Sequence, residues 1–266
     1  MLCILWDIDG TLMSSQGAGT KAMNDAFQAC FGIPDAFEDV AMSGCTDPWI
    51  FRQGYERHRI SEAFPTAMEK FDREYRKALP GRLATSKITL KPGLPALLDV
   101  LSKRDDIGSG LLTGNFDHGA ETKLRAAGIW HYFATGAYGS DDEDRNKLLP
   151  HALRRFRERG REFHPHRTIV IGDTTRDVAC ARAHGEGGGS GDGGSPDGRV
   201  AGVRSGPGAA KPGGPGAADG VSGEDDGGGS AGVARRIRGR FRVIRFHPRI
   251  LLRLMERHLN GKGIRG

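Results

Sequence analysis

The sequence predicts an α/β fold, in which an all-helical domain is inserted into a doubly wound parallel sheet. From residue 89 to residue 185, short apolar runs alternate with helix-like segments, which is typical of a parallel sheet. Residues 14–88 carry helical spacing without strand signals, so they form the insertion. We therefore predict a core of residues 1–13 and 89–185, with a helical cap of residues 14–88 between its two parts.

The core begins with one strand before the chain enters the insertion. Leu2–Trp6 is a short, unbroken apolar run, which favours a buried parallel strand that ends at the acidic residues after it. In the insertion, Thr20–Phe31 has apolar residues at helical spacing. Further helices are predicted at Trp49–Arg59, after a start signal at Asp47 and Pro48, and at Ser61–Leu79.

Strands and helices then alternate through the second part of the core. Pro92 and Gly93 open a helix that runs to Ser102, and Gly128 stops another that begins at Glu121. The predicted strands are Ile107–Leu112, Phe133–Ala137 and Thr168–Ile171, and the remaining predicted helices are Asn146–Arg159 and Asp177–Ala183.

The composition changes after His184. Residues 185–234 contain 20 glycines, and such a segment buries too little apolar surface to offset an ordering cost of about 1–2 kcal/mol per residue. We expect a disordered, glycine-rich linker at 186–234 and an arginine-rich tail at 235–266. The tail could bind nucleic acid or an anionic membrane surface. It has no recognisable nucleic-acid-binding motif, so we expect no specific nucleic-acid partner.

The charge and the cysteines bound the class of protein. The net charge of +6 comes from residues 186–266, with 14 basic and 8 acidic residues, while residues 1–185 hold 25 of each. The basic character therefore says nothing about the part that carries the motifs. The four cysteines lack metal-type spacing and indicate reduced thiols in a cytoplasmic protein. We expect neither a signal peptide nor a transmembrane segment, which would need an apolar run of roughly 18 residues.

Polar residues follow three predicted strands at the points where the strands end. Asp7 and Asp9 follow the first strand, Thr113 the second, and Asp173 the strand that begins at Thr168. In a parallel sheet these ends share one edge, where open α/β sheets bind ligands. Two acids so close repel when both are ionised, so we expect a cation or a shared proton there. Hydroxyl and backbone N–H groups suit phosphate oxygens, and carboxylates suit a hard divalent cation.

Four motifs stand in order at these strand ends and helix starts. They are DIDGT at 7–11, LLTGN at 111–115, EDRNKLLP at 143–150 and IGDTTRDVACARAHG at 171–185. Together they resemble the haloacid dehalogenase superfamily, and within it the phosphoglycolate-phosphatase-like hydrolases, which have a Rossmann-like core and a helical cap. The resemblance covers residues 1–185 and implies a phosphomonoester hydrolase that acts on a small phosphorylated substrate.

The resemblance also implies roles for single residues. Asp7 would be the nucleophile that forms an aspartyl-phosphate, and Asp9 would protonate the leaving oxygen and then activate water. Thr113 would hold the transferring phosphoryl group. Either Arg145 or Lys147 would supply the cation of the third motif, and the planar guanidinium favours Arg145. Phosphate and substrate contacts are expected from Gly10, Thr11, Thr46, Gly114 and Asn115.

The implied cofactor is Mg²⁺. It would be held by Asp7, the backbone carbonyl of Asp9 and Asp173, with Asp177 in support. Asp9 favours phosphoester chemistry, because the name-giving dehalogenases lack this acid and the ion-pumping ATPases have Thr in its place. Cys45 stands in a cap loop where such enzymes often carry Arg or Lys, which argues against phosphoglycolate itself. A sugar phosphomutase shares the four motifs and is the alternative enzyme.

The chain departs from the superfamily after Gly185, where members continue into another apolar strand. We therefore expect the sheet to lack the edge strand beside the strand that carries Asp173. A shift of the reading frame near Gly185 would account for the departure and would make this protein a catalytically impaired product with an accidental basic tail. The nucleotide sequence of the gene tests this alternative, because the other frame must then encode an apolar strand after residue 185.

Overall fold

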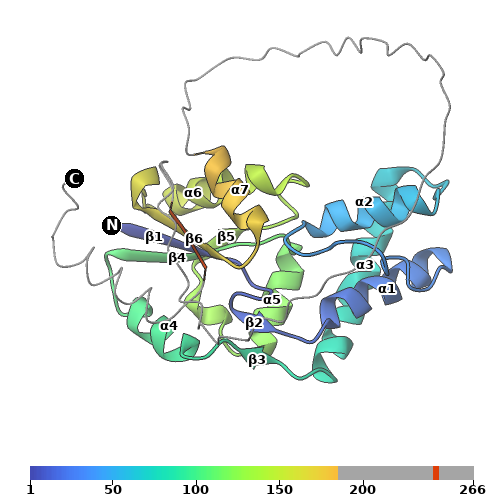
Figure 1. The fold of residues 1–266 in the computed structure, drawn as a ribbon, viewed down its shortest axis with the longest axis horizontal. Coiled ribbons are helices and arrows are strands. Elements are labelled where there is room, and N and C mark those ends of the chain that lie inside the picture. The colour runs from blue at the N-terminus through green and yellow to red at the C-terminus, as the bar shows by residue number, and fades with distance from the viewer. Residues whose placement is uncertain (185–241, 246–266) are drawn as a thin grey trace, which may run out of the picture. The chain divides into compact units, whose positions relative to one another are not determined.

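The computed structural model describes residues 1–184 and 242–245, and a five-stranded sheet forms its centre (Figure 1). The strand order is β5-β4-β1-β6-β7, and every neighbouring pair is parallel. The strands are β1 (Leu2–Trp6), β4 (Ile107–Leu112), β5 (Thr135–Ala137), β6 (Thr168–Gly172) and β7 (Arg242–Arg245). The predicted α/β class with a parallel sheet is confirmed.

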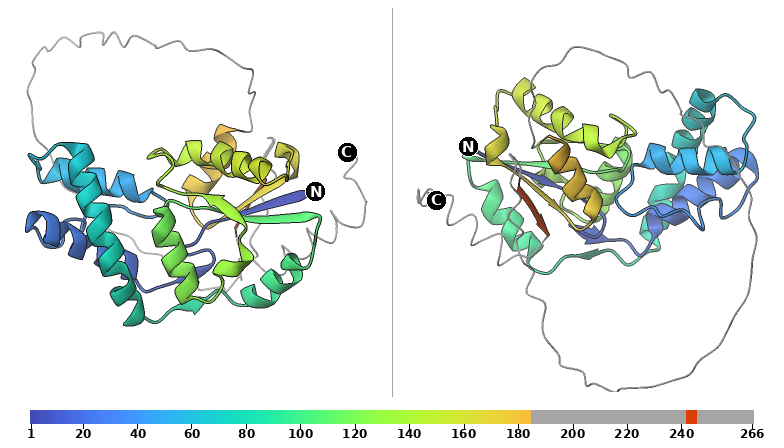
Figure 2. Two further views of the ribbon diagram at one scale, coloured as in Figure 1. Left: turned by 180° about the vertical axis from the view of Figure 1, so that it is seen from behind. Right: turned by 45° about the horizontal axis from the view of Figure 1, so that its top comes forward.

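Helices cover both faces of the sheet. In β1, Ile4 and Trp6 belong to one apolar cluster with α4 and α5, whereas Cys3 and Leu5 belong to another with α6 and α7. Successive side chains of a strand point to opposite faces, so β1 supplies both layers of the core. Figure 2 shows the two helix layers on either side of the sheet. The covering helices are α4 (Leu94–Ser102), α5 (Asp117–Ala126), α6 (Leu148–Glu158) and α7 (Thr175–Ala183).

The helix predicted at Asn146–Arg159 is divided into a 3-10 turn, η2 (Arg145–Lys147), and α6. The Asp144 carboxylate accepts a hydrogen bond from the backbone N–H of Asn146 at 2.9 Å, which stabilises the turn. Arg145 is buried in this turn, and Lys147 is exposed. Two further 3-10 turns are η1 (Trp130–Tyr132) and η3 (Pro165–Arg167).

A helical insertion of three helices, α1 (Ala18–Phe31), α2 (Asp47–Arg57) and α3 (Phe64–Ala84), follows β1. These helices share an apolar cluster of their own. The ring of Phe51 lies 6.1 Å from that of Phe27 and 4.7 Å from that of Phe71 between centroids. The antiparallel pair β2 (Met13–Ser14) and β3 (Thr89–Leu90) joins the two connections to the core. None of the helices within residues 1–184 has the length and apolar character of a membrane span.

β7 overturns one expectation from the sequence. It pairs in parallel with β6, and Val170 lies opposite Val243. The prediction that the sheet lacks the strand beside β6 is therefore wrong. Val243 and Ile244 are β-branched, a residue type that favours strands, but the arginines around them give the segment the composition of a basic tail. All other residues of the predicted linker and tail lie outside the described residues.

Candidate active site

Three neighbouring strands end in polar side chains at one edge of the sheet. Asp7 follows β1, Thr113 follows β4 and Asp173 follows β6, and β1 lies between the other two strands. The backbone N–H of Asp7 donates to the carbonyl oxygen of Ile171 at 2.9 Å, which holds the end of β1 to β6. The structure therefore brings these residues to one crevice, as the strand order of an open α/β sheet requires.

Asp7 is buried against a guanidinium group. Arg145 Nη2 lies 3.1 Å from Asp7 Oδ1 and 2.5 Å from Asp177 Oδ1. Burial raises the pKa of Asp7 to about 7; Arg145 opposes this shift, and the neighbouring carboxylates add to it. Burial disfavours the charged form of Arg145, but the two carboxylates outweigh it and raise its pKa. Of the two candidate cations in the third motif, Arg145 is the one that contacts Asp7.

Asp7, Asp173 and Asp177 form an acidic cluster, in which each offers a carboxylate oxygen within 4.8 Å of the others. Oxygen ligands of this kind suit Mg²⁺. Both oxygens of Asp177 already accept hydrogen bonds, from Arg145 at 2.5 Å and from Thr174 Oγ1 at 2.7 Å. Asp7 and Asp173 are therefore better placed to be direct ligands, while Asp177 holds Arg145 beside them.

Gly10 leaves room for the acidic cluster. Its φ is +80°, and a Cβ at this position would overlap the carboxylate of Asp173. Thr11 Oγ1 donates to Asp173 Oδ1 at 3.2 Å, so the turn after β1 also orients that carboxylate. A side chain at position 10 would strain the backbone and displace Asp173. The donor set therefore fits a divalent cation, and the turn that follows the first motif preserves it.

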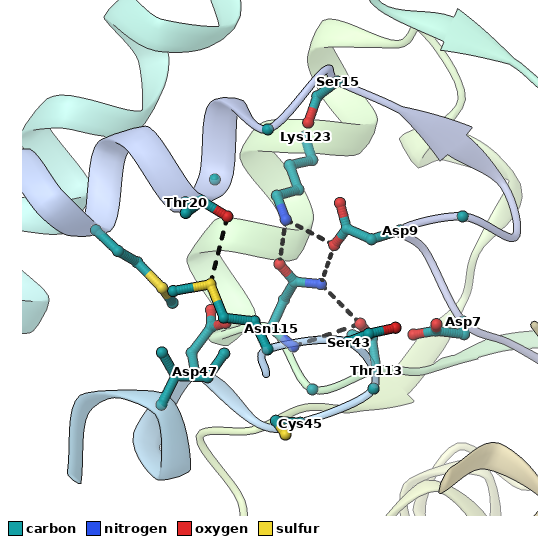
Figure 3. Close-up of a pocket in the computed structure, with 18 of the residues that line it drawn as sticks. Asp7, Asp9, Ser15, Thr20, Ser43, Cys45, Asp47, Thr113, Asn115 and Lys123 are labelled. Carbon is teal, nitrogen blue, oxygen red and sulfur yellow. Dashed lines mark hydrogen bonds and ion pairs between the residues drawn. The ribbon is translucent and has the colours of Figure 1, made fainter. Parts of the chain in front are cut away.

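Asp9 is not part of the acidic cluster and instead pairs with the ammonium group of Lys123. Lys123 Nζ lies 2.7 Å from Asp9 Oδ2 and 2.6 Å from Asn115 Oδ1. Asn115 Nδ2 donates to Asp9 Oδ2 at 2.9 Å and to Thr113 Oγ1 at 2.8 Å, and Figure 3 shows this network. Burial raises the pKa of Asp9, but Lys123 and Asn115 outweigh burial and hold the pKa below its usual range. Asp9 is therefore held as a carboxylate.

A cavity of about 330 Å³ opens at Asp7 and Asp9 and is lined by residues of the core and of the helical insertion. Asp47, at the start of α2, is buried there, and its Oδ2 accepts a hydrogen bond from the Phe116 N–H at 2.8 Å. Burial raises the pKa of Asp47 to about 6, and Lys123 opposes this shift. The cavity has the size of a small-molecule site. The hydroxyl-bearing residues that line it are Ser14, Ser15, Thr20, Ser43, Tyr75 and Thr113.

The predicted site residues divide between this cavity and its surroundings. Lys147 is exposed, with Nζ 3.3 Å from Asp142 Oδ2. Thr46 Oγ1 donates to the carbonyl oxygen of Glu143 at 2.6 Å and caps α2. Lys147 and Thr46 line a second cavity, and Thr11 contacts Asp173. The predicted residues that line the first cavity are Asp7, Asp9, Gly10, Thr113, Gly114, Asn115 and Arg145.

Reasoning from the sequence does not find Lys123 or Asp47 as site residues. Lys123 follows Ala120 by three residues and precedes Leu124 on α5, and both neighbours are buried. A lysine on the buried face of an amphipathic helix is a detectable signal. Asp47 indicates only a helix start, and α2 does begin there. Its bond to Phe116 is a tertiary contact that local sequence does not reveal.

The fold and the carboxylates at the sheet edge define an α/β enzyme whose crevice lies beside a helical insertion. The chain belongs to the haloacid dehalogenase-like hydrolase family, whose model matches residues 1–185. The resemblance inferred from the four motifs is thereby confirmed, and the protein is a hydrolase. The search of curated proteins found no match.

Solved structures of this fold include CbbY from Rhodobacter sphaeroides in complex with phosphate, which is 21% identical with a TM-score of 0.54. A mutant of CbbY in complex with xylulose-(1,5)bisphosphate has the same identity and TM-score. A putative phosphoglycolate phosphatase from Lactobacillus plantarum is 23% identical with a TM-score of 0.47. Each match covers 68% of this chain and 82% of the other. The two CbbY structures support the fold.

Proposed function

We propose that the protein is a magnesium-dependent phosphomonoester hydrolase that acts on a small phosphorylated metabolite through an aspartyl-phosphate on Asp7. The position of Asp7 is the observation that supports this proposal most directly. Its carboxylate is buried at the end of β1, lies 3.1 Å from Arg145, and belongs to a cluster with Asp173. Mg²⁺ bound by Asp7 and Asp173 would supply positive charge that stabilises the transferring phosphoryl group and favours the ionised form of Asp7.

The side chains divide the reaction into two halves. In the first half, a carboxylate oxygen of Asp7 attacks phosphorus and the bond to the leaving oxygen breaks, while Asp9, which has first taken up a proton from solvent, gives that proton to the leaving oxygen. In the second half, Asp9 takes a proton from water as the water oxygen attacks phosphorus. The bond to Asp7 then breaks, which releases phosphate and restores the carboxylate.

Neighbouring groups orient these two acids. Arg145 contacts Asp7, and the Thr113 hydroxyl, which lines the same cavity, would bind a phosphoryl oxygen. Lys123 and Asn115 favour the carboxylate of Asp9, which is the form that takes a proton from water in the second half. The free cysteines support a cytoplasmic location, which we also propose.

Phosphate release from a panel of sugar phosphates, nucleotides and phosphoglycolate tests the proposal. We expect turnover of at least one ester with Mg²⁺, loss of turnover in EDTA, and a loss of at least about a thousandfold in Asp7→Asn. Borohydride added during turnover should convert residue 7 to homoserine, which mass spectrometry detects. Hydrolysis that survives Asp7→Asn contradicts the mechanism. Isomerisation of a sugar phosphate without phosphate release would instead indicate a phosphomutase.

A further inference from the structure

We propose that Tyr75 is a specificity-determining residue, which hydrogen-bonds a hydroxyl on the leaving group and so favours sugar or polyol phosphates over carboxylated esters. The inference rests on the proposed phosphatase activity. Tyr75 lies on α3 of the helical insertion, outside the four motifs, and it lines the cavity that opens at Asp7 and Asp9.

The Tyr75 hydroxyl is buried, and no described protein group forms a hydrogen bond with it. The residue is 0% exposed, and its oxygen has no hydrogen-bond partner among the described residues. Buried hydroxyl groups nearly always have a hydrogen-bond partner, because a buried hydroxyl without a hydrogen bond destabilises the fold. A hydroxyl of this kind on a cavity wall indicates that a ligand supplies the partner.

Aromatic packing fixes the position of this hydroxyl. The Tyr75 ring is parallel to that of Phe71 within 4°, with centroids 6.2 Å apart, and the Phe116 ring lies 6.0 Å away. The backbone of α5 also lies against the ring at Gly119, where a Cβ would be in van der Waals contact with Tyr75 Cε1 at 3.4 Å. The hydroxyl is therefore preorganised for one direction of approach.

The Tyr75 side chain and the carboxylate network around Asp9 line the same cavity. A Cβ on Gly19, at the start of α1, would lie 3.8 Å from the Tyr75 oxygen and 3.1 Å from Lys123 Nζ. Gly19 also lines the cavity. Tyr75 and the lysine that binds Asp9 therefore lie close together at one end of the cavity, and a leaving group that Asp9 protonates would lie beside both.

The charges around this end of the cavity favour an uncharged group. Lys123 already binds Asp9, and Arg145 binds two carboxylates in the acidic cluster. Among the described residues that line the cavity, these two are the only Lys or Arg side chains, while Asp47 adds a buried carboxyl group. A carboxylate on the leaving group would be repelled by these acidic side chains, and no unpaired Lys or Arg among the described lining residues would offset the repulsion. A hydroxyl can accept from Tyr75 and donate to an acid.

Comparison of Tyr75→Phe with Tyr55→Phe tests the inference. Both variants lose one phenolic oxygen from the helical insertion, but the Tyr55 hydroxyl lies outside the cavity and donates to the carbonyl oxygen of Glu62 at 2.7 Å. Three substrates are compared. The first is the hydroxyl-bearing ester that wild-type protein hydrolyses best in a panel of hexose and glycerol phosphates. The second is phosphoglycolate, and the third is p-nitrophenyl phosphate, whose leaving group carries no hydroxyl besides the one formed on cleavage.

We expect wild-type protein to prefer the hydroxyl-bearing ester to phosphoglycolate. Tyr75→Phe should lower kcat/KM for that ester about tenfold, leave kcat/KM for p-nitrophenyl phosphate within about twofold, and leave Tm unchanged or raised because no internal bond is lost. Tyr55→Phe should lower Tm and change neither rate.

Three results would overturn the inference while leaving the phosphatase proposal intact. They are an equal loss by Tyr75→Phe on both esters, no loss on either ester, and a preference for phosphoglycolate. If wild-type protein hydrolyses none of the esters, the proposed function fails, and the inference fails with it.

Discussion

Asp7 and Asp9 stand two residues apart but occupy opposite electrostatic environments. Burial raises the pKa of Asp7 to about 7, whereas Lys123 and Asn115 outweigh burial at Asp9 and hold its pKa below the usual range. Neighbouring carboxyl groups whose pKa values are pushed apart can take different catalytic roles. Lys123 is the group that lowers the pKa of Asp9 most, so its removal is informative.

Replacing Lys123 with Met removes the charge and keeps the apolar stem. Burial would then raise the pKa of Asp9 against less opposition, and the carboxylate that takes a proton from water would form only at higher pH. We expect the acidic limb of the kcat profile to move to higher pH, with a loss of about tenfold at pH 6. Steady-state rates from pH 5 to pH 9 in saturating Mg²⁺ measure this shift.

Lys147→Met is the matched control, because the Lys147 side chain is 63% exposed and pairs with Asp142. It should leave the pH profile unchanged. A Lys123→Met profile that overlays that of the wild type would mean that Lys123 has only a structural role.

At the scale of residues, the sequence reveals the chemistry that is encoded locally. The first motif identifies Asp7, and the third motif leaves Arg145 and Lys147 as candidate cations, because spacing along the chain places them at a strand end and a helix start. Lys123 and Tyr75 are not found this way. The contact of Lys123 with Asp9 joins residues 114 positions apart, and the role proposed for Tyr75 depends on the cavity that it lines.

At the scale of elements, the alternating apolar pattern predicts the type of nearly every core element. β4 has the bounds Ile107–Leu112 that the sequence predicts. β7 is not predicted from the sequence, because the composition of the segment around it favours a basic tail. Its pairing with β6 is what stabilises it as a strand. A strand of four residues depends on its neighbour more than on its own sequence.

Proline substitution in β7 tests that pairing. In a parallel pair, alternate backbone N–H groups of an edge strand face the neighbouring strand. Val243→Pro and Ile244→Pro therefore differ, because one removes an N–H that bonds β6 and the other removes an N–H that faces away. We expect one variant to lower the free energy of unfolding by about 1–3 kcal/mol and the other by less. Urea unfolding followed by circular dichroism measures both.

Equal unfolding midpoints for both variants and the wild type would mean that residues 242–245 do not contribute a paired strand in solution. Unequal effects would show that the segment after the glycine-rich stretch is part of the folded core. That result would also weigh against an accidental sequence after Gly185, because an accidental tail has no reason to complete the sheet beside Asp173.

At the scale of the whole molecule, folding gathers acidic groups that an unfolded chain keeps apart. The pKa of Asp7 is about 7 in the folded protein, against a usual value of 3.8. Between these values the folded state binds a proton that the unfolded state does not bind. This group therefore lowers the stability of the metal-free protein as the pH rises from about 4 to about 7. A bound cation would remove the penalty by favouring the carboxylate.

Thermal melts of wild-type protein and Asp7→Asn at pH 5 and pH 8 measure this coupling. In EDTA, we expect the variant to gain Tm over the wild type at pH 8 and to gain little at pH 5, because only the wild type carries the ionised group. Added Mg²⁺ should raise the Tm of the wild type more than that of the variant, because a ligand stabilises the state that binds it. Asp39→Asn is the matched control, since Asp39 is 74% exposed and pairs with Arg57 at the surface. A variant that melts with the wild type at pH 8 in EDTA, or gains as much from Mg²⁺, would contradict a buried carboxylate that binds the cation.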